Sequence, residues 1–303
     1  MIIFDPKTVR RNRSRALQKA KTQDKPPFFL MDWAVDTLCE RLNVVKRDFD
    51  NGLVFGLRQS PDKLEKLRTA GPVKNLIQAD SVVQQQAPHR TGIFAAEADM
   101  LPLGANSMDA LFHIMTLHTI NDLPGALIQV NRVLKPDGLF MGCLFGGETL
   151  FQLRESFMHV ESAVKGGVSP RIFPFADKQQ MGALMQRAGF ALPVIDSEII
   201  TVTYENSFAL MQDLRAMGEN NAIQARSKTN PGQSFFMDVA RHYQQNYSDN
   251  DGRIEASFEI IFLLGWSPHH SQQQPSQRGS ATISLADALN TEEIGTGAIP
   301  PKE

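Results

Sequence analysis

The sequence predicts an α/β protein with a doubly wound, mostly parallel sheet, and three observations support this prediction. Short apolar runs alternate with helix-like stretches through the first half of the chain. Glycine, acidic or polar residues follow several of these runs, as they do where ligands meet the carboxyl ends of parallel strands. The chain has 303 residues, of which 42% are hydrophobic, so it can bury the core that such a sheet needs.

The first strand is expected at Phe49 to Phe55. It leads into Gly56 and then into a helix from Pro61, which is the strand–turn–helix order of a mononucleotide-binding unit. An amphipathic helix precedes this strand, because Phe29, Trp33, Leu38 and Leu42 recur at near-helical spacing.

Four further strands are expected in the first half, at Val73 to Asp80, around Ile93 to Ala96, from Asp109 to about Met115, and over 138–145. A helix with a proline near its first turn comes before the last of these strands, and Pro136 and Gly138 are expected to stop it. Beyond Gly146 the pattern predicts helices over 147–164, 177–190 and 208–222, and strands over 194–205 and 256–266.

The same patterns suggest three parts: a basic arm over 1–27, an α/β domain over 28–266 with a helical insertion at about 205–250, and a polar tail over 267–303. The arm carries seven Lys and Arg residues and no acid between residues 7 and 21. It is either a contact for an acidic partner, nucleic acid or membrane surface, or a solvated helical extension.

The composition argues against several classes of protein. A net charge of −2 argues against general nucleic-acid binding, and two cysteines do not provide a disulfide framework or a cysteine zinc site. The longest apolar run, Ile260 to Trp266, is too short to span a membrane, and the start lacks a secretory signal.

Five predicted cofactor residues follow the strands: Gly56, Asp80, Glu97, Met115 and His118. Gly56 ends the first strand, and Asp80 ends the second, where a carboxylate can accept both hydroxyls of a ribose. Glu97 follows the third strand and could accept a hydrogen bond from an adenine amino group. Met115 closes the fourth. The alternative for each acid is a turn or helix cap.

Two residues are candidates for catalysis. His118 follows the fourth strand and is either a general base or iron ligand, or a histidine packed under the cofactor site. Glu148 follows the fifth strand and lies either at the rim of a site or at a helix start favoured by the macrodipole. The seven histidines do not form a recognisable iron-binding set, so any iron site is invisible in the sequence.

The stretch from "EADMLPLGANSMDALFHIMTLHTIND" to "LKPDGLFMGCLFGG" resembles the second half of class I S-adenosylmethionine-dependent methyltransferases of the type 11 group. "LFGGETLFQLRES", "GGVSPRIFPF", "LMQDLRAMGENNA" and "QRGSATISL" resemble segments of the complex I assembly factor 5 family. The resemblance covers about Phe4 to Leu285. It implies a Rossmann-like methyltransferase fold with an antiparallel final strand and added helices.

The family also implies a partner and an activity. The partner is a protein substrate, a peripheral-arm subunit of NADH dehydrogenase, and the activity is hydroxylation of an arginine. "RAMGENNA" (Arg215 to Ala222) and "QRGSA" (Gln277 to Ala281) are candidate surfaces for that substrate, or a helix C-cap and an ordered tail. The "FDPKTVRRNRSRA" start resembles the beginning of the family domain, so a bacterial cytoplasmic member is expected, or a mitochondrial matrix protein if the source is eukaryotic.

The first cofactor motif departs from the family. "LDLGCGRG" falls on "LVFGLRQS", Leu53 to Ser60, so the acid becomes Val54 and the later glycines become Arg58 and Ser60. An inward Arg58 would repel the sulfonium of S-adenosylmethionine, whereas an outward Arg58 could pair with an acid. Three hypotheses follow: an arginine-modifying enzyme, a non-catalytic assembly chaperone with a degenerate cofactor site, and a conventional type 11 methyltransferase.

Overall fold

The seven strands of the computed structural model form one sheet in the order β3-β2-β1-β4-β5-β7-β6. The structure describes residues 2–22, 27–58, 60–71, 73–83, 92–273, 279–280 and 282–292. Strands β1 to β5 are mutually parallel, and β7 is antiparallel to both β5 and β6, as predicted. The strands are β1 (Phe49–Phe55), β2 (Val73–Asp80), β3 (Ile93–Ala95), β4 (Met108–Ile114), β5 (Leu134–Phe145), β6 (Ala191–Tyr204) and β7 (Ile254–Trp266).

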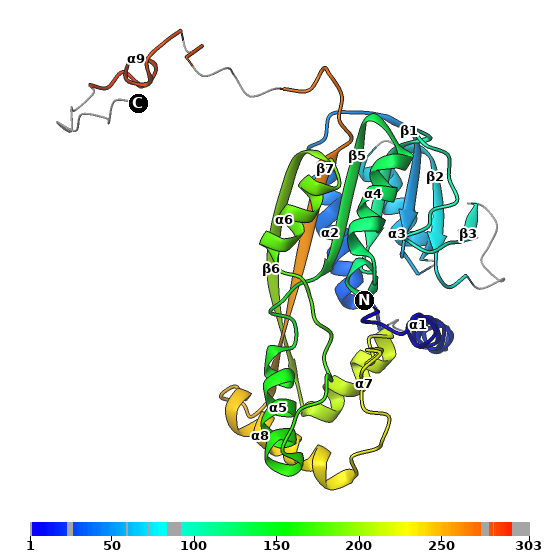
Figure 1. The fold of residues 1–303 in the computed structure, drawn as a ribbon, viewed down its shortest axis with the longest axis vertical. Coiled ribbons are helices and arrows are strands. Elements are labelled where there is room, and N and C mark those ends of the chain that lie inside the picture. Colours follow the sequence, from blue (N-terminus) through cyan, green and yellow to red (C-terminus); the bar gives the residue numbers. More distant parts are fainter. Residues whose placement is uncertain are drawn as a thin grey trace. The chain divides into compact units, whose positions relative to one another are not determined.

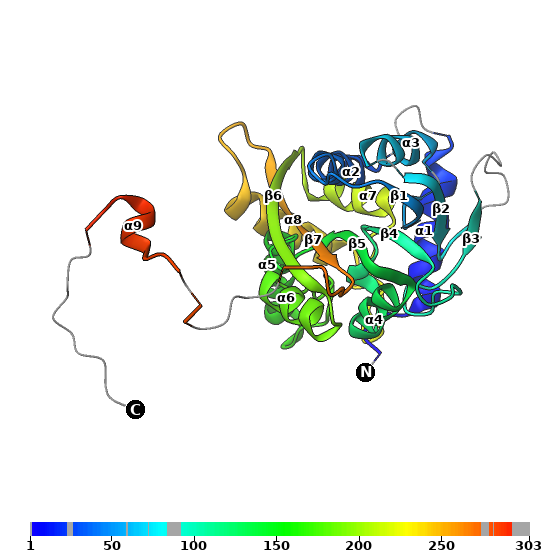
Figure 2. The same cartoon turned by 90° about the horizontal axis from the view of Figure 1, so that it is seen from above.

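Helices cover both faces of the sheet, with α2 and α3 on one side and α4 and α6 on the other (Figure 2). Alternate residues of β1 enter different cores: Val54 packs with α2 and α3, whereas Leu53 and Phe55 pack with α4 and α6. Figure 1 shows α1, α5, α7 and α8 beyond one end of the sheet. The helices are α1 (Pro6–Ala20), α2 (Phe29–Leu42), α3 (Pro61–Ala70), α4 (Leu123–Val133), α5 (Phe151–Lys165), α6 (Lys178–Arg187), α7 (Ser207–Met217), α8 (Gln233–Tyr247) and α9 (Leu285–Leu289), with a 3₁₀ turn η1 (Leu117–Thr119).

The chain divides into two units, Met1–His269 and His270–Glu303. The first contains the sheet, and the described part of the second contains α9, whose N-cap is Ser284. The predicted division into arm, domain and tail remains a prediction. No helix in the described part of the chain is long and apolar enough to cross a membrane.

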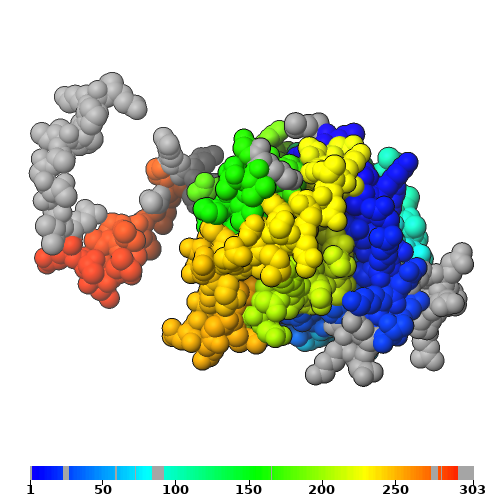
Figure 3. Space-filling model, turned by 90° about the horizontal axis from the view of Figure 1, so that it is seen from below, coloured from blue at the N-terminus to red at the C-terminus, as the bar shows by residue number. Residues whose placement is uncertain are grey.

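The basic segment at the start belongs to the first unit and packs against the rest of it. Asp5 caps α1 by accepting hydrogen bonds from the backbone amides of Lys7 and Thr8. Phe4 forms an antiparallel bridge with Ile223, which follows α7 in the chain, and the side chain of Asn121 binds the backbone amides of Ile3 and Phe4. In the space-filling view, α1 (blue) lies beside the yellow segment that joins α7 to α8 (Figure 3).

Three sequence predictions about helix boundaries and faces were wrong. Helix α4 ends at Val133, and Pro136 and Gly138 lie inside β5, which starts at Leu134. Helix α5 starts at Phe151 rather than near Glu148, because Leu150 takes a left-handed conformation (φ 56°). Phe29 is 37% exposed, whereas Leu38 and Leu42 of the predicted face of α2 are buried and Trp33 packs against the core. The other buried residues of α2 are Leu30, Met31, Ala34, Val35 and Cys39.

Gly56 is required by the close approach of the ends of β1 and β4. Its backbone has a φ of +88°, and a Cβ there would collide with the carbonyl oxygen of Ile114 and lie 2.6 Å from Cγ2 of Thr116. Glycine alone avoids both the contact and the strained dihedral.

We expect Gly56→Ala to lower the free energy of unfolding by about 1–3 kcal/mol, the cost of one strained backbone position. Denaturant unfolding measures this loss. Gly104→Ala is the matched control, since a Cβ at Gly104 meets nothing within 4 Å. Equal losses in the two variants would show that the fit at Gly56 is unimportant.

Candidate functional site

The loops after the parallel strands meet at one edge of the sheet, and three of them are held in an unusual conformation. Arg58 after β1, Met115 after β4 and Leu150 after β5 have φ values of 52°, 47° and 56°. Non-glycine residues rarely adopt this left-handed region, and such positions concentrate at functional sites. This edge is therefore the first place to look for the site.

Arg58 takes an acidic partner from within the chain. Its Nη2 donates to Oε1 of Glu219 at 2.8 Å, and its Nη1 donates to the carbonyl of Met217. The guanidinium also lies over the ring of Phe28, with Cζ 4.9 Å from the ring centroid. The side chain is 6% exposed, so Arg58 keeps the left-handed backbone of a glycine loop while its charge is paired beyond the end of α7.

Glu219 binds His118 through its second oxygen, with Nε2 of His118 3.1 Å from Oε2. The His118 ring packs edge-on against Phe145, and burial lowers the pKa of His118 despite the opposing charge of Glu219. Nε2 of His118 faces the Glu219 carboxylate, and the buried Nδ1 has no hydrogen-bond partner in the described structure. We call Arg58, Glu219 and His118 the buried charge network.

The network favours an ionised Glu219. Burial alone would raise the pKa of Glu219, but His118, Arg58 and Arg13 outweigh it and lower the pKa to about 2. His113, by contrast, belongs to the core: it stacks on Phe55, and burial lowers its pKa to about 3.

Asp80 lies beside a second buried arginine. Its carboxylate accepts a hydrogen bond from the amide of Val82 at 3.2 Å. Burial raises the pKa of Asp80, and the charge of Arg13 opposes that rise. Arg13 comes from α1, is 6% exposed, and donates to Oγ1 of Thr119 at 2.7 Å. Helix α1 therefore covers the end of β2.

A small cavity of about 70 Å³ lies next to Arg13. Glu97 lines it and forms an ion pair with Arg10 of α1, each side chain being about half exposed. Asp80 is not among the lining residues. They are Pro6, Val9, Arg10, Arg13, Phe55, Ser81, Glu97, Ala98, Asp99, Thr116, Thr119, Ile120 and Asn121.

These residues suit only one half of S-adenosylmethionine. Asp80 and Glu97 follow β2 and β3, where carboxylates can accept hydrogen bonds from a ribose and an adenine. Arg58 places a side chain and a cation where a glycine would face the methionine half. The residue types after β2 and β3 match the nucleoside half, but Asp80 is buried and does not line the small cavity, so this conformation offers the nucleoside no open space there. In the described ranges no three His, Cys, Asp or Glu side chains gather as a metal site.

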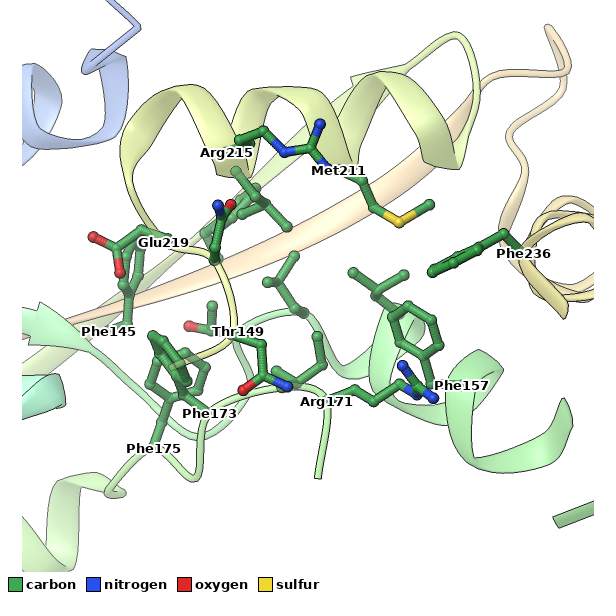
Figure 4. A pocket seen from close by; sticks show the side chains of 17 residues that line it. Phe145, Thr149, Phe157, Arg171, Phe173, Phe175, Met211, Arg215, Glu219 and Phe236 are labelled. Atoms are coloured by element: carbon green, nitrogen blue, oxygen red, sulfur yellow. The ribbon is translucent and has the colours of Figure 1, made fainter. Parts of the chain in front are cut away.

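A larger cavity of about 330 Å³, the aromatic pocket, opens beside the network. Its walls carry six phenylalanines, and Glu219 lies at one end next to Phe145 (Figure 4). Arg171 enters the pocket but is paired with Glu161 at 2.7 Å. The lining residues are Phe145, Thr149, Leu150, Leu153, Phe157, Arg171, Ile172, Phe173, Phe175, Met211, Leu214, Arg215, Glu219, Asn220, Asn221, Phe236 and Phe258.

The structure separates the predicted site residues into three groups. His118 belongs to the buried charge network. Asp80 ends β2, and Gly56 and Met115 directly follow β1 and β4 at the same edge of the sheet. Glu97 lies across the small cavity. Glu148 is exposed and lines neither cavity, although its backbone amide donates to Oε2 of Glu259 at 3.0 Å.

Sequence reasoning missed Arg13 and Glu219 as members of the site. The predicted surface segment Arg215 to Ala222 contained Glu219 and does line the aromatic pocket. Of the other predicted surface, Gln277 to Ala281, only residues 279–280 are among the described residues.

Comparisons with known proteins show the fold and the family of the chain. Residues 43–142 match the family model of a methyltransferase domain. The chain is 34% identical to the arginine-hydroxylase NDUFAF5, mitochondrial, of Mus musculus, over 96% of this chain and 85% of that protein. It is 33% identical to the malonyl-[acyl-carrier protein] O-methyltransferase of Gallionella capsiferriformans, over 57% of each.

Among solved structures, the YcgJ protein of Bacillus subtilis is similar with a TM-score of 0.53. The identity is 14%, and the match covers 78% of this chain and 99% of that chain. This likeness concerns the fold alone. Strand order, the antiparallel β7 and the domain match confirm the predicted class I methyltransferase fold.

We expect Glu219→Gln to destabilise the protein by roughly 3–5 kcal/mol at neutral pH, because it leaves Arg58 as a buried charge without its partner. The lowered pKa of Glu219 means that the ionised carboxylate stabilises the fold. This stabilisation is complete above pH 4.5 and is lost as the pH falls towards 2. The difference in unfolding free energy between the wild type and Glu219→Gln should therefore shrink over that window. Glu65→Gln, which alters an exposed carboxylate, is the control and should show no such trend.

Proposed function

Since the chain belongs to the family of the mitochondrial arginine-hydroxylase NDUFAF5, we propose that it acts on an arginine side chain of a protein. The protein we propose is a peripheral-arm subunit of NADH dehydrogenase, and the setting is the assembly of complex I. The compartment would be the one where that arm is built, a bacterial cytoplasm or a mitochondrial matrix.

The aromatic pocket is the observation that carries this proposal. A guanidinium is planar and weakly hydrated, and it stacks on aromatic rings. Six phenylalanines line the pocket, with one carboxylate, Glu219, at its end. The volume of about 330 Å³ is at the small end for ligand pockets, which suits one side chain rather than a large cofactor.

The pocket also lies where chemistry on this fold is expected. Phe145 is the last residue of β5 and packs against both His118 and Phe175. An arginine in the pocket would thus reach the carboxyl edge of the sheet, where ligands bind in open α/β folds.

We further propose an adenosine-containing ligand at this edge, held by Asp80 and Glu97, with S-adenosylmethionine as the first compound to test. Because Arg58 does not suit its methionine half, no step is derived through it. Hydroxylation inserts one oxygen atom and draws on an oxidant from outside the chain.

A second candidate is an assembly chaperone that binds the arginine-bearing segment without modifying it. Two observations favour a chaperone. Arg58, paired with Glu219, replaces the loop glycine of the cofactor motif, and α1 covers the end of β2, where a cofactor would bind. The same observations argue against a conventional type 11 methyltransferase.

Mass spectrometry distinguishes the candidates. The protein is incubated with the peripheral-arm subunit, dioxygen, Fe(II), a reductant and S-adenosylmethionine, and the arginine-containing peptide is weighed. We expect an oxygen increment. A methyl increment would support the methyltransferase, and measurable subunit binding without any increment would support the chaperone.

Phe175→Ala should weaken binding of the subunit by roughly tenfold, because one aromatic wall of the pocket is lost. Phe208→Ala is the matched control, since Phe208 lies on α7 outside the lining residues and is 37% exposed. Calorimetry measures both. Equal affinities in the two variants would place the arginine elsewhere.

Asp80→Asn should weaken binding of S-adenosylmethionine or adenosine by about 1.5–3 kcal/mol, the range for a hydrogen bond to a charged group. Calorimetric titration measures the change. Asp50→Asn is the control, because Asp50 pairs with Lys74 at the start of β1, far from the carboxyl edge. An unchanged affinity in Asp80→Asn would remove Asp80 from the site.

A further inference from the structure

We propose that Glu219 recognises the guanidinium of the substrate arginine. In the absence of substrate, the guanidinium of Arg58 occupies this carboxylate in its place. The inference rests on the proposed function, and it makes Glu219 the specificity-determining residue of the aromatic pocket. It also gives a role to the arginine that replaces a cofactor-loop glycine.

The position of Glu219 supports the first part. It is the only acidic residue among those described that line the aromatic pocket. Its carboxylate lies beside Phe145 and is turned away from the middle of the cavity (Figure 4). Arg58 and His118 hold its two oxygens from behind, at 2.8 and 3.1 Å. A guanidinium that enters along the phenylalanines can pair with Glu219 only if the carboxylate turns towards the cavity and gives up one of these partners.

Arg58 is bound in the way that a substrate arginine would be. Its guanidinium has a carboxylate, a backbone carbonyl and an aromatic face, from Glu219, Met217 and Phe28. A second guanidinium could replace it at Glu219 with the same chemistry, because planar, carboxylate-directed donors are a general property of arginine.

The hydrogen bonding of Arg58 is incomplete, which makes its displacement by a substrate guanidinium feasible. Its buried Nε has no hydrogen-bond partner in the described structure, and its backbone stays left-handed. The unsatisfied Nε disfavours the resting state relative to one in which the side chain is released and this atom is solvated.

A separate cavity could accept the side chain of Arg58 after its release from Glu219. Arg58 also lines this cavity of about 430 Å³ on the side of α2 and α3. Asp32, Asp62, Lys21 and Lys63 line that cavity as well. Lys63 already lies 3.6 Å from Asp32, so Asp62 is the carboxylate with which the displaced cation could pair. The exchange thereby avoids placing the guanidinium groups of Arg58 and of the substrate against the single carboxylate of Glu219.

Binding of Nα-acetylarginine methylamide tests the proposal without subunit or cofactor. Calorimetry compares the wild type with Arg58→Met, and the methyl resonance of Met211, which lines the aromatic pocket, reports whether the probe enters it. Nα-acetylcitrulline methylamide is the uncharged matched probe. Arg58→Met/Glu219→Gln is the matched variant, because it removes both charges of the pair.

We expect Arg58→Met to bind the arginine probe about tenfold more tightly, as when only a tenth of the wild type is in the open state. The double variant should lose this gain, and the citrulline probe should not show it. Equal or weaker affinity in Arg58→Met, or a gain that survives in the double variant, would overturn the proposal.

Arg58→Lys covers the case in which Arg58→Met does not fold. It keeps the cation but cannot hold Glu219 with a planar fork, so we expect a smaller gain in the same direction. No gain in Arg58→Lys then overturns the proposal. Two combined outcomes separate this inference from the proposed function. If the subunit gains an oxygen but Arg58→Met binds the probe no more tightly than the wild type, only this inference is wrong. If Arg58→Met binds the probe more tightly but the subunit gains no oxygen, only the proposed reaction is wrong.

Discussion

The ion pair between Arg58 and Glu219 is the interaction on which the site depends. It joins the loop after β1 to the residues after α7 across 161 positions of sequence. Removing both ions from water costs several kcal/mol each, and a bare pair seldom recovers that cost. Here each ion has further partners, since Arg58 binds the Met217 carbonyl and Phe28 and Glu219 binds His118. The pair thereby fixes one end of the aromatic pocket to the edge of the sheet.

Much of the fold could be predicted because its strands and helices leave short-range patterns. The alternation of apolar runs and amphipathic stretches placed all seven strands to within a few residues. The boundary at Pro136 failed for a physical reason: the proline lies at the start of β5, where the pairing with β4 shifts register between Met108 and Ala110. Proline without an amide hydrogen is tolerated at such an irregular place.

The site was only half predictable, because its decisive contacts join distant segments. The positions of Asp80, Glu97 and His118 after strands follow from the strand pattern, whereas the partner of Arg58 does not. The sequence allowed the Arg58 side chain to point either into the cofactor site or away from it. Which of these occurs depends on Glu219, which follows α7. Arg13 was equally hidden, since its neighbours on α1 are mostly exposed cations and only the fold turns this one inward.

The bridge between Phe4 and Ile223 has a consequence for biosynthesis. A chain that grows from its amino end makes α1 long before the residues that shelter it. Release of the intervening stretch takes on the order of ten to forty seconds at ordinary translation rates. During that time the apolar face of α1 and the guanidinium of Arg13 stay without their final neighbours. Helix α1, although it is translated first, is therefore among the last elements to reach its final packing.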